Sequence, residues 1–157
     1  MKKVALSFLL LYTAPVWAAS TDTLLLQGSV TAVNDIAVTA VSGVNNSLNI
    51  VGGQSNVTVA NVAETSNNLL GYKIMMSSAN AGELRNASDA SKKTTYTVVY
   101  GSGSAMTPTT SAAQVKSVSS LTGLTTNSSA VKVNVVAYPS APAGTYSDTV
   151  TLSIVAN

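Results

Sequence analysis

The 157-residue chain is long enough for one domain with a core of its own. It contains no cysteine and no histidine, which excludes disulfides, Ser-His-Asp and Cys-His catalytic sets and ordinary zinc sites. Charged residues make up only 9% of the chain and the formal net charge is +2, so there is no basic field to attract nucleic acid or anionic lipid.

The first 18 residues have the pattern of a secretory signal peptide. Lys2 and Lys3 form a basic head, an apolar run extends from Val4 to Tyr12, and Val16–Ala18 fits a small-residue cleavage site. The apolar run is shorter than the roughly 20 residues of a membrane span. We therefore expect cleavage after Ala18 and an exported chain without membrane insertion. Removing two of the eight basic residues leaves six, equal to the six acidic residues, and near-zero net charge favours association between copies.

The mature chain opens on a segment, Leu24–Val30, with the alternation of a β-strand. Leu24, Leu26, Gly28 and Val30 occupy one face, which predicts a single row to be buried. Gly28 in this row predicts either a shallow point in the surface that buries it or a bulge. Because the segment follows a free N-terminus, we expect it to be buried on another copy of the chain. Residues 19–32 are thus assigned to an extension and 33–157 to a single domain.

Short alternating runs separated by turn residues continue to the C-terminus. Seven to nine such runs predict an all-β sandwich. Residues 109–124 are ambiguous, because 111–116 fit either one helical turn or, with Val118 and Leu121, a loose edge strand. In the last run, Val150, Leu152 and Ile154 are expected to face inward. The predicted strands cover residues 35–41, 48–50, 56–60, 70–76, 83–85, 94–100, 130–137 and 146–154.

Little catalytic chemistry is indicated by the remaining residues. The acidic residues of the mature chain are scattered, and we expect them to be solvated surface charges and turn caps. No catalytic residue, metal site or cofactor is predicted, and an exported enzyme acting through Asp148 or Glu83 is the least favoured alternative. The five mature tyrosines are expected to pack in the core or at sheet edges, with a sugar-binding surface as the alternative.

The two ends of the chain resemble a known family. The stretch from Leu24 to Asp35 is similar to the N-terminus of major pilins of the colonisation-factor-antigen (alternate) branch of chaperone–usher fimbriae, which also lack cysteine. The ending Ala143–Leu152 resembles the final strand of that branch, of the archaic branch and of spore-coat-protein-U domains. The middle of the chain, which is most of it, has no such similarity.

The resemblance implies an immunoglobulin-like β-sandwich that lacks one strand and is completed by a donor strand. It implies a structural, non-enzymatic pilin that polymerises by donor-strand exchange into a cell-surface fimbria for adhesion or biofilm formation. The implied partners are other copies of the chain, a periplasmic chaperone, an outer-membrane usher and a tip adhesin. A non-polymeric secreted coat protein or glycan-binding adhesin module is the alternative. The implied donor residues are Leu24, Leu26, Gly28 and Val30, and the implied acceptor groove is flanked by Ile36, Val38, Val150, Leu152 and Ile154.

Overall fold

The computed structural model describes residues 20–157, so the signal peptide predicted for residues 1–18 lies outside the described residues. Thr31–Asn157 forms one compact unit, which begins two residues before the predicted domain start. Residues 20–30 belong to a separate unit and contain no strand, although the alternation of Leu24–Val30 predicts one. A strand that has no partner strand gains no ladder hydrogen bonds, which accounts for this difference.

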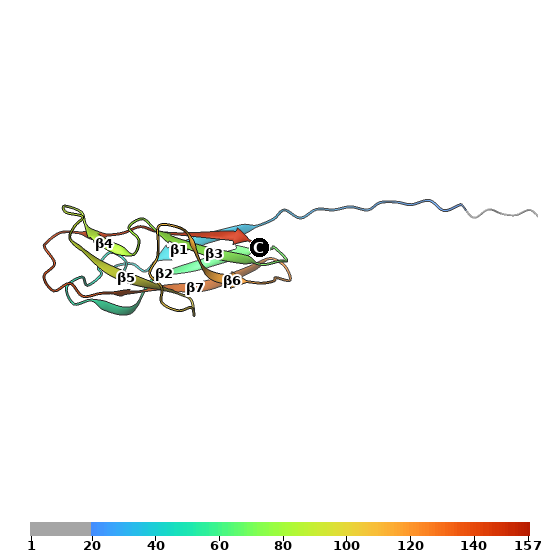
Figure 1. Cartoon of the computed structure of the whole chain (residues 1–157). Helices are drawn as coiled ribbons and strands as arrows, with labels where there is room; N and C mark the ends of the chain where they lie inside the picture. Colours follow the sequence, from blue (N-terminus) through green and yellow to red (C-terminus); the bar gives the residue numbers. More distant parts are fainter. Residues whose placement is uncertain (1–19) are drawn as a thin grey trace, which may run out of the picture. The chain divides into compact units, whose positions relative to one another are not determined.

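Within the described residues the fold is an all-β, immunoglobulin-like sandwich of nine strands and no helix, which confirms the predicted fold class (Figure 1). One sheet has six strands in the order β1-β2-β7-β5-β4-β8, and the other has three in the order β6-β3-β9. All pairings between these strands are antiparallel. The strands are β1 Asn34–Ala40, β2 Gln54–Ser66, β3 Tyr72–Ser78, β4 Glu83–Asn86, β5 Lys93–Tyr100, β6 Ala113–Val118, β7 Thr125–Val135, β8 Tyr146–Ser147 and β9 Val150–Ala156.

The core lies between the two sheets and is built from alternate residues of the central strands. On β3, the predicted inward row of Tyr72, Ile74 and Met76 has no exposed surface at all. The inward rows of β5 and β7 are also buried, as their alternation predicts. The core of apolar residues comprises Ala60, Val62, Tyr72, Ile74, Met76, Leu84, Tyr96, Val98, Tyr100, Val131, Val133 and Val135.

Some predicted elements differ from the structure. Residues 48–50 form no strand; they lie in the long β1–β2 connection, residues 41–53, where Leu48 and Ile50 pack against the core. The ambiguous stretch 109–124 contains the edge strand β6, so the helical alternative is wrong. The final run is broken at Asp148, which separates β8 from β9 and lets the chain pass from one sheet to the other.

Two of the four edge strands, β1 and β9, come from opposite ends of the sequence. β1 is one edge of the six-stranded sheet, and β9 is one edge of the three-stranded sheet. Among the described strands, β1 pairs only with β2 and β9 pairs only with β3. The two edges belong to different sheets and lie near each other, so the space between them determines whether the core is closed on this side.

Candidate functional site

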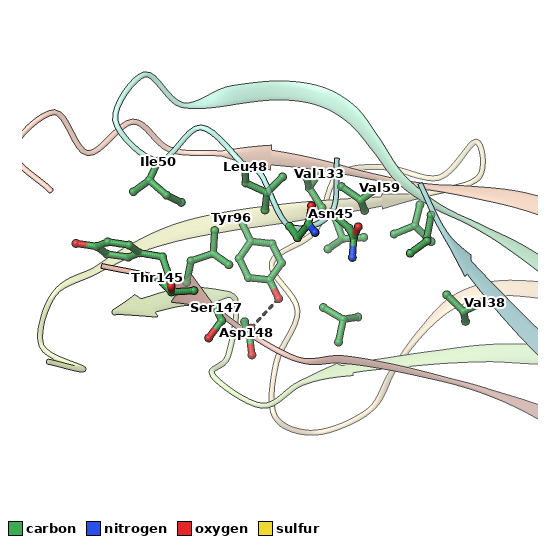
Figure 2. Close-up of a pocket in the computed structure, with 18 of the residues that line it drawn as sticks. Val38, Asn45, Leu48, Ile50, Val59, Tyr96, Val133, Thr145, Ser147 and Asp148 are labelled. Atoms are coloured by element: carbon green, nitrogen blue, oxygen red, sulfur yellow. Dashed lines mark hydrogen bonds between the residues drawn. The ribbon is translucent and has the colours of Figure 1, made fainter. Parts of the chain in front are cut away.

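A groove between β1 and β9 has a volume of about 710 Å³. Its floor is formed by residues of the apolar core, which are at most 8% exposed. Inward-facing residues of the two edge strands form its walls, and Val38 and Val150 remain 54% and 37% exposed. Figure 2 shows the groove. The groove is lined by Val38 and Ala40 on β1, by Val150 and Leu152 on β9, and by Ala60, Tyr96, Val98, Val131 and Val133 on the floor.

The hydrogen-bond register shows which backbone groups β1 presents to the groove. Val33 and Val41, just outside the two ends of β1, continue its ladder with β2. Asn67 N, directly after β2, donates to Val33 O at 3.2 Å, and Val41 N donates to Val59 O on β2 at 2.8 Å. Because bonded and non-bonded pairs alternate in an antiparallel ladder, the odd-numbered residues of β1 face β2. The N–H and C=O groups of the even-numbered residues, Val38 and Ala40 among them, point to the open edge.

The same reasoning applies to β9. Ala79 N donates to Thr149 O at 2.9 Å, and Asn157 N donates to Gly71 O at 3.2 Å, so odd-numbered residues of β9 face β3. Even-numbered residues, including Val150 and Leu152, direct their backbone groups to the open edge. Both edges therefore present unpaired donors and acceptors on the same residues whose side chains line the groove. An apolar floor between two such edges has the chemistry of a missing strand.

The main polar group in the groove is already satisfied. The Asp148 carboxylate accepts a hydrogen bond from Tyr96 Oη at 2.7 Å (Figure 2). It also accepts hydrogen bonds from Ser78 Oγ at 2.5 Å and the backbone N–H of Asn80 at 2.9 Å. Burial and the neighbouring carboxylate raise the pKa of Tyr96 above its usual value. Asp148 also caps the N–H of Thr149, at the break between β8 and β9. It thus closes the corner of the groove and needs no external ligand.

The structure separates the five predicted acceptor residues into two sets. Val38, Val150 and Leu152 line the groove. Ile36 and Ile154 do not; both are partly buried against the core at the other end of β1 and β9. The groove therefore extends from the middle of the two strands toward β8 and the β1–β2 connection, and it is closed where Ile36 and Ile154 lie.

A buried charged network near the closed end of the groove was missed by sequence reasoning. Glu64 was expected to be solvated, but its side chain has no exposed surface. Tyr72 Oη donates to it at 2.7 Å, Tyr100 Oη at 2.6 Å and Lys116 Nζ at 2.7 Å. Burial raises the pKa of Glu64, but the hydrogen bonds, first that of Lys116, outweigh this effect and hold the pKa below its usual value. Glu64 follows the inward row of Ala60 and Val62, which is the only signal in the sequence.

The other predicted residues are placed as follows. The donor residues Leu24, Leu26 and Val30 are 83%, 83% and 88% exposed, and no atom lies near the position of a Cβ on Gly28. Of the tyrosines, the three on β3 and β5 are buried, which confirms core packing for them. Tyr138 and Tyr146 are half-buried and meet edge to face with ring centroids 6.4 Å apart, so only these two remain for a sugar-binding surface.

The chain matches no family model and none of the curated proteins. Within residues 20–157, no cluster of three or more His, Cys, Asp or Glu side chains could hold a metal ion. The same part of the chain has no helix that is long and apolar enough to cross a membrane. The groove between β1 and β9 is therefore the candidate functional site on its own geometry.

Proposed function

We propose that the protein is a structural subunit that polymerises by strand donation. The alternating segment Leu24–Val30 of one copy fills the groove between β1 and β9 of the next copy. The observation that carries the proposal is the groove itself. It has an apolar floor between the edges of β1 and β9, and the unpaired backbone groups of each edge point toward the other edge. The same chain supplies an apolar, alternating segment that has no strand partner of its own.

The hydrogen-bond register of the edges supports this occupant. In an antiparallel pair, directly opposed residues share a face. A donor that runs antiparallel to β9 would thus set Leu24, Leu26 and Val30 opposite the inward row of Val150 and Leu152. It would also use the unpaired backbone groups of those residues. The outward residues of the donor would then pair with β1, so that both open edges are satisfied by one strand.

The side chains of the donor also suit an apolar groove. Burying each of the two leucines and the valine of the inward row is worth roughly 1.5–3 kcal/mol. The opposite face of the segment carries Leu25, Gln27 and Ser29, and it faces solvent in this arrangement. Near-zero net charge in the mature chain keeps repulsion between copies low.

The wider setting of the proposal is a surface fimbria of the chaperone–usher class. An exported subunit with an open groove would need a periplasmic chaperone to cover it before assembly, since unpaired edges beside apolar surface promote aggregation. An outer-membrane usher would then join copies, and a tip adhesin would contact the receptor in adhesion or biofilm formation. The alternative, a glycan-binding module, has only the Tyr138–Tyr146 pair in its support.

The chain offers a matched test on two adjacent leucines. Leu26 belongs to the inward row and Leu25 to the outward one, and they are 83% and 80% exposed in the single chain. Leu26→Asp should abolish fibres, because a carboxylate cannot be buried unpaired in the groove. Leu25→Asp should leave assembly intact. Electron microscopy of shear-released surface material and counts of SDS-resistant multimers measure both.

One control and two contradicting outcomes define the result. Both variants must be exported to the same level as the parent chain, measured by immunoblot of the periplasmic fraction. Equal assembly by Leu26→Asp and Leu25→Asp contradicts donation through the inward row. Failure of the parent chain to form any fibre contradicts the proposed function as a whole.

A further inference from the structure

Three exposed leucines gather at one end of the sandwich and have no role in the groove. Leu69 and Leu70 in the β2–β3 turn and Leu124 just before β7 are 67%, 66% and 66% exposed. They are neighbours because β2 ends where β7 begins, with Ser66 paired to Thr125. We call this set the leucine end.

The β2–β3 turn holds its two leucines in a fixed position. Leu121 N donates to Leu69 O at 3.2 Å, and Asn157 Nδ2 donates to Leu70 O at 2.7 Å. Gly71, with φ of 78°, closes the turn, and a Cβ there would lie 1.9 Å from Val118 O. A rigid turn that exposes two leucines is a costly arrangement for a surface that stays in water.

The compact unit Thr31–Asn157 begins beside the leucine end. Asn67, two residues before Leu69, holds the start of the compact unit on both sides of its amide. Its Nδ2 donates to Thr31 O at 2.8 Å, and its Oδ1 accepts from Val33 N at 2.7 Å. The donor segment ends at Val30, one residue before Thr31. At about 3.5 Å per residue, a copy that holds Leu24–Val30 must therefore abut the leucine end.

The groove also indicates which end of the acceptor copy faces the leucine end of the donor copy. The groove is closed toward Ile36 and Ile154 and continues toward β8 and the β1–β2 connection. That side of the sandwich exposes Val51 at 55% and Val136 at 58%, which we call the valine end. Tyr138 N donates to Ile50 O at 2.8 Å and joins the two segments that carry these valines. The valine and leucine ends lie at the two ends of the 13-residue strand β2, about 40 Å apart.

We infer that, in the polymer, the leucine end of each copy packs against the valine end of the copy that holds its donor segment. This inference rests on the proposed function and adds a second contact to it, whose partner is another copy of the same chain. The contact buries apolar side chains of both copies and limits the angle between them. Removing it should leave the donor strand in place and weaken the joint between copies.

Cysteine cross-linking tests the contact directly, because the natural chain has no cysteine. Fibres of the full chain carrying Leu70→Cys with Val51→Cys, or Leu70→Cys with Val136→Cys, are oxidised and run on non-reducing SDS gels after heating. At least one pair should give a ladder of covalent multimers that a reductant collapses, since a disulfide needs Cβ atoms about 4 Å apart. The matched control pairs Leu70→Cys with Ser153→Cys, which is exposed on the outward face of β9, and should give no ladder.

A second measurement applies if the cysteine variants do not form fibres. Fibres of Leu69→Ser, Leu70→Ser and Leu124→Ser chains should dissociate faster in denaturant by about tenfold for each leucine that the contact buries. Fibres that form without either ladder, or that dissociate at the parental rate in all three serine variants, overturn the contact and leave strand donation standing. If neither the parent chain nor the Leu26→Asp variant forms fibres, the proposed function itself is overturned.

Discussion

The buried pair of Glu64 and Lys116 gives the sharpest stability prediction. Lys116→Met removes the cation but keeps an unbranched apolar stem of similar length. Glu64 then remains fully buried with only the hydroxyls of Tyr72 and Tyr100 as partners. Breaking a buried pair costs roughly 3–5 kcal/mol, and we expect about 3 kcal/mol because the Lys116 side chain is itself 27% exposed. For a body of this size that loss lowers Tm by roughly 10 °C.

The pH dependence of the variant distinguishes this mechanism from general loss of packing. In the parent chain the pKa of Glu64 is below its usual value of 4.5, so its contribution to stability is present above that value and is lost as pH falls through the lowered pKa. In Lys116→Met the main cause of lowering is gone, and burial raises the pKa instead. Acid then neutralises the unpaired carboxylate, so the difference in stability between the variant and the parent should shrink below about pH 5.

Thermal and urea unfolding of the mature chain, followed by circular dichroism between pH 4 and 8, measures both effects. Lys73→Met is the matched control, because Lys73 is exposed on the outward face of β3 and should change stability by less than about 0.5 kcal/mol. Combining Lys116→Met with Glu64→Gln should recover part of the loss, since no unpaired charge remains. The reasoning is refuted if Lys116→Met unfolds within about 1 kcal/mol of the parent chain at pH 7, or if the difference grows in acid.

Three further outcomes are expected from side chains already described. Gly71→Ala should lower the free energy of unfolding by more than about 1 kcal/mol, because of its positive φ and the close carbonyl, whereas Gly28→Ala should be neutral in urea denaturation of the single chain. Asp148→Asn should destabilise the chain by about 1–3 kcal/mol in the same assay, because the carboxylate accepts several hydrogen bonds. Burial, followed by the hydrogen bond to Glu64, raises the pKa of Tyr72 to about 12. In ultraviolet titration Tyr72 should therefore ionise near pH 12, and Glu64→Gln should lower that midpoint.

Much of the sandwich follows from local patterns in the sequence. The alternation of Tyr72, Ile74 and Met76 predicts a strand with one buried face, and the structure confirms it. The pattern succeeds here because β3 is the central strand of its sheet, with neighbours on both sides. It fails for residues 48–50, where three alternating residues are too few to distinguish a strand from a turn that tucks two side chains against the core.

The Glu64 network could not be predicted because its members are distant in sequence. The hydroxyl of Tyr72, that of Tyr100 and the amine of Lys116 lie 8, 36 and 52 residues away from Glu64. Alternation with Val62 does place Glu64 on the inward face. A carboxylate at such a position conflicts with burial until its partners are known, and strand pairing alone determines those partners.

The strands that flank the groove could be predicted from the sequence, but the length of the groove could not. Alternation gave the inward faces of β1 and β9, including Val38 and Leu152. It could not show that Ile36 and Ile154 lie where the groove is closed, because that depends on how two edges from different sheets diverge. The strand donation assigned to this site remains a proposal until the Leu26 and Leu25 variants are compared.

The alternation of backbone directions along the two edges has a consequence for hydrogen exchange in the single chain. Amides of Thr39 and Thr151 point into ladders, whereas those of Val38 and Leu152, one residue away, point to the open groove. Exchange along β1 and β9 should therefore show a two-residue sawtooth, with protected and unprotected amides in turn. A strand that binds between the two edges would slow the exchange of only the fast amides and so remove the sawtooth. Exchange rates would then report occupancy of the groove residue by residue, without a label on the bound strand.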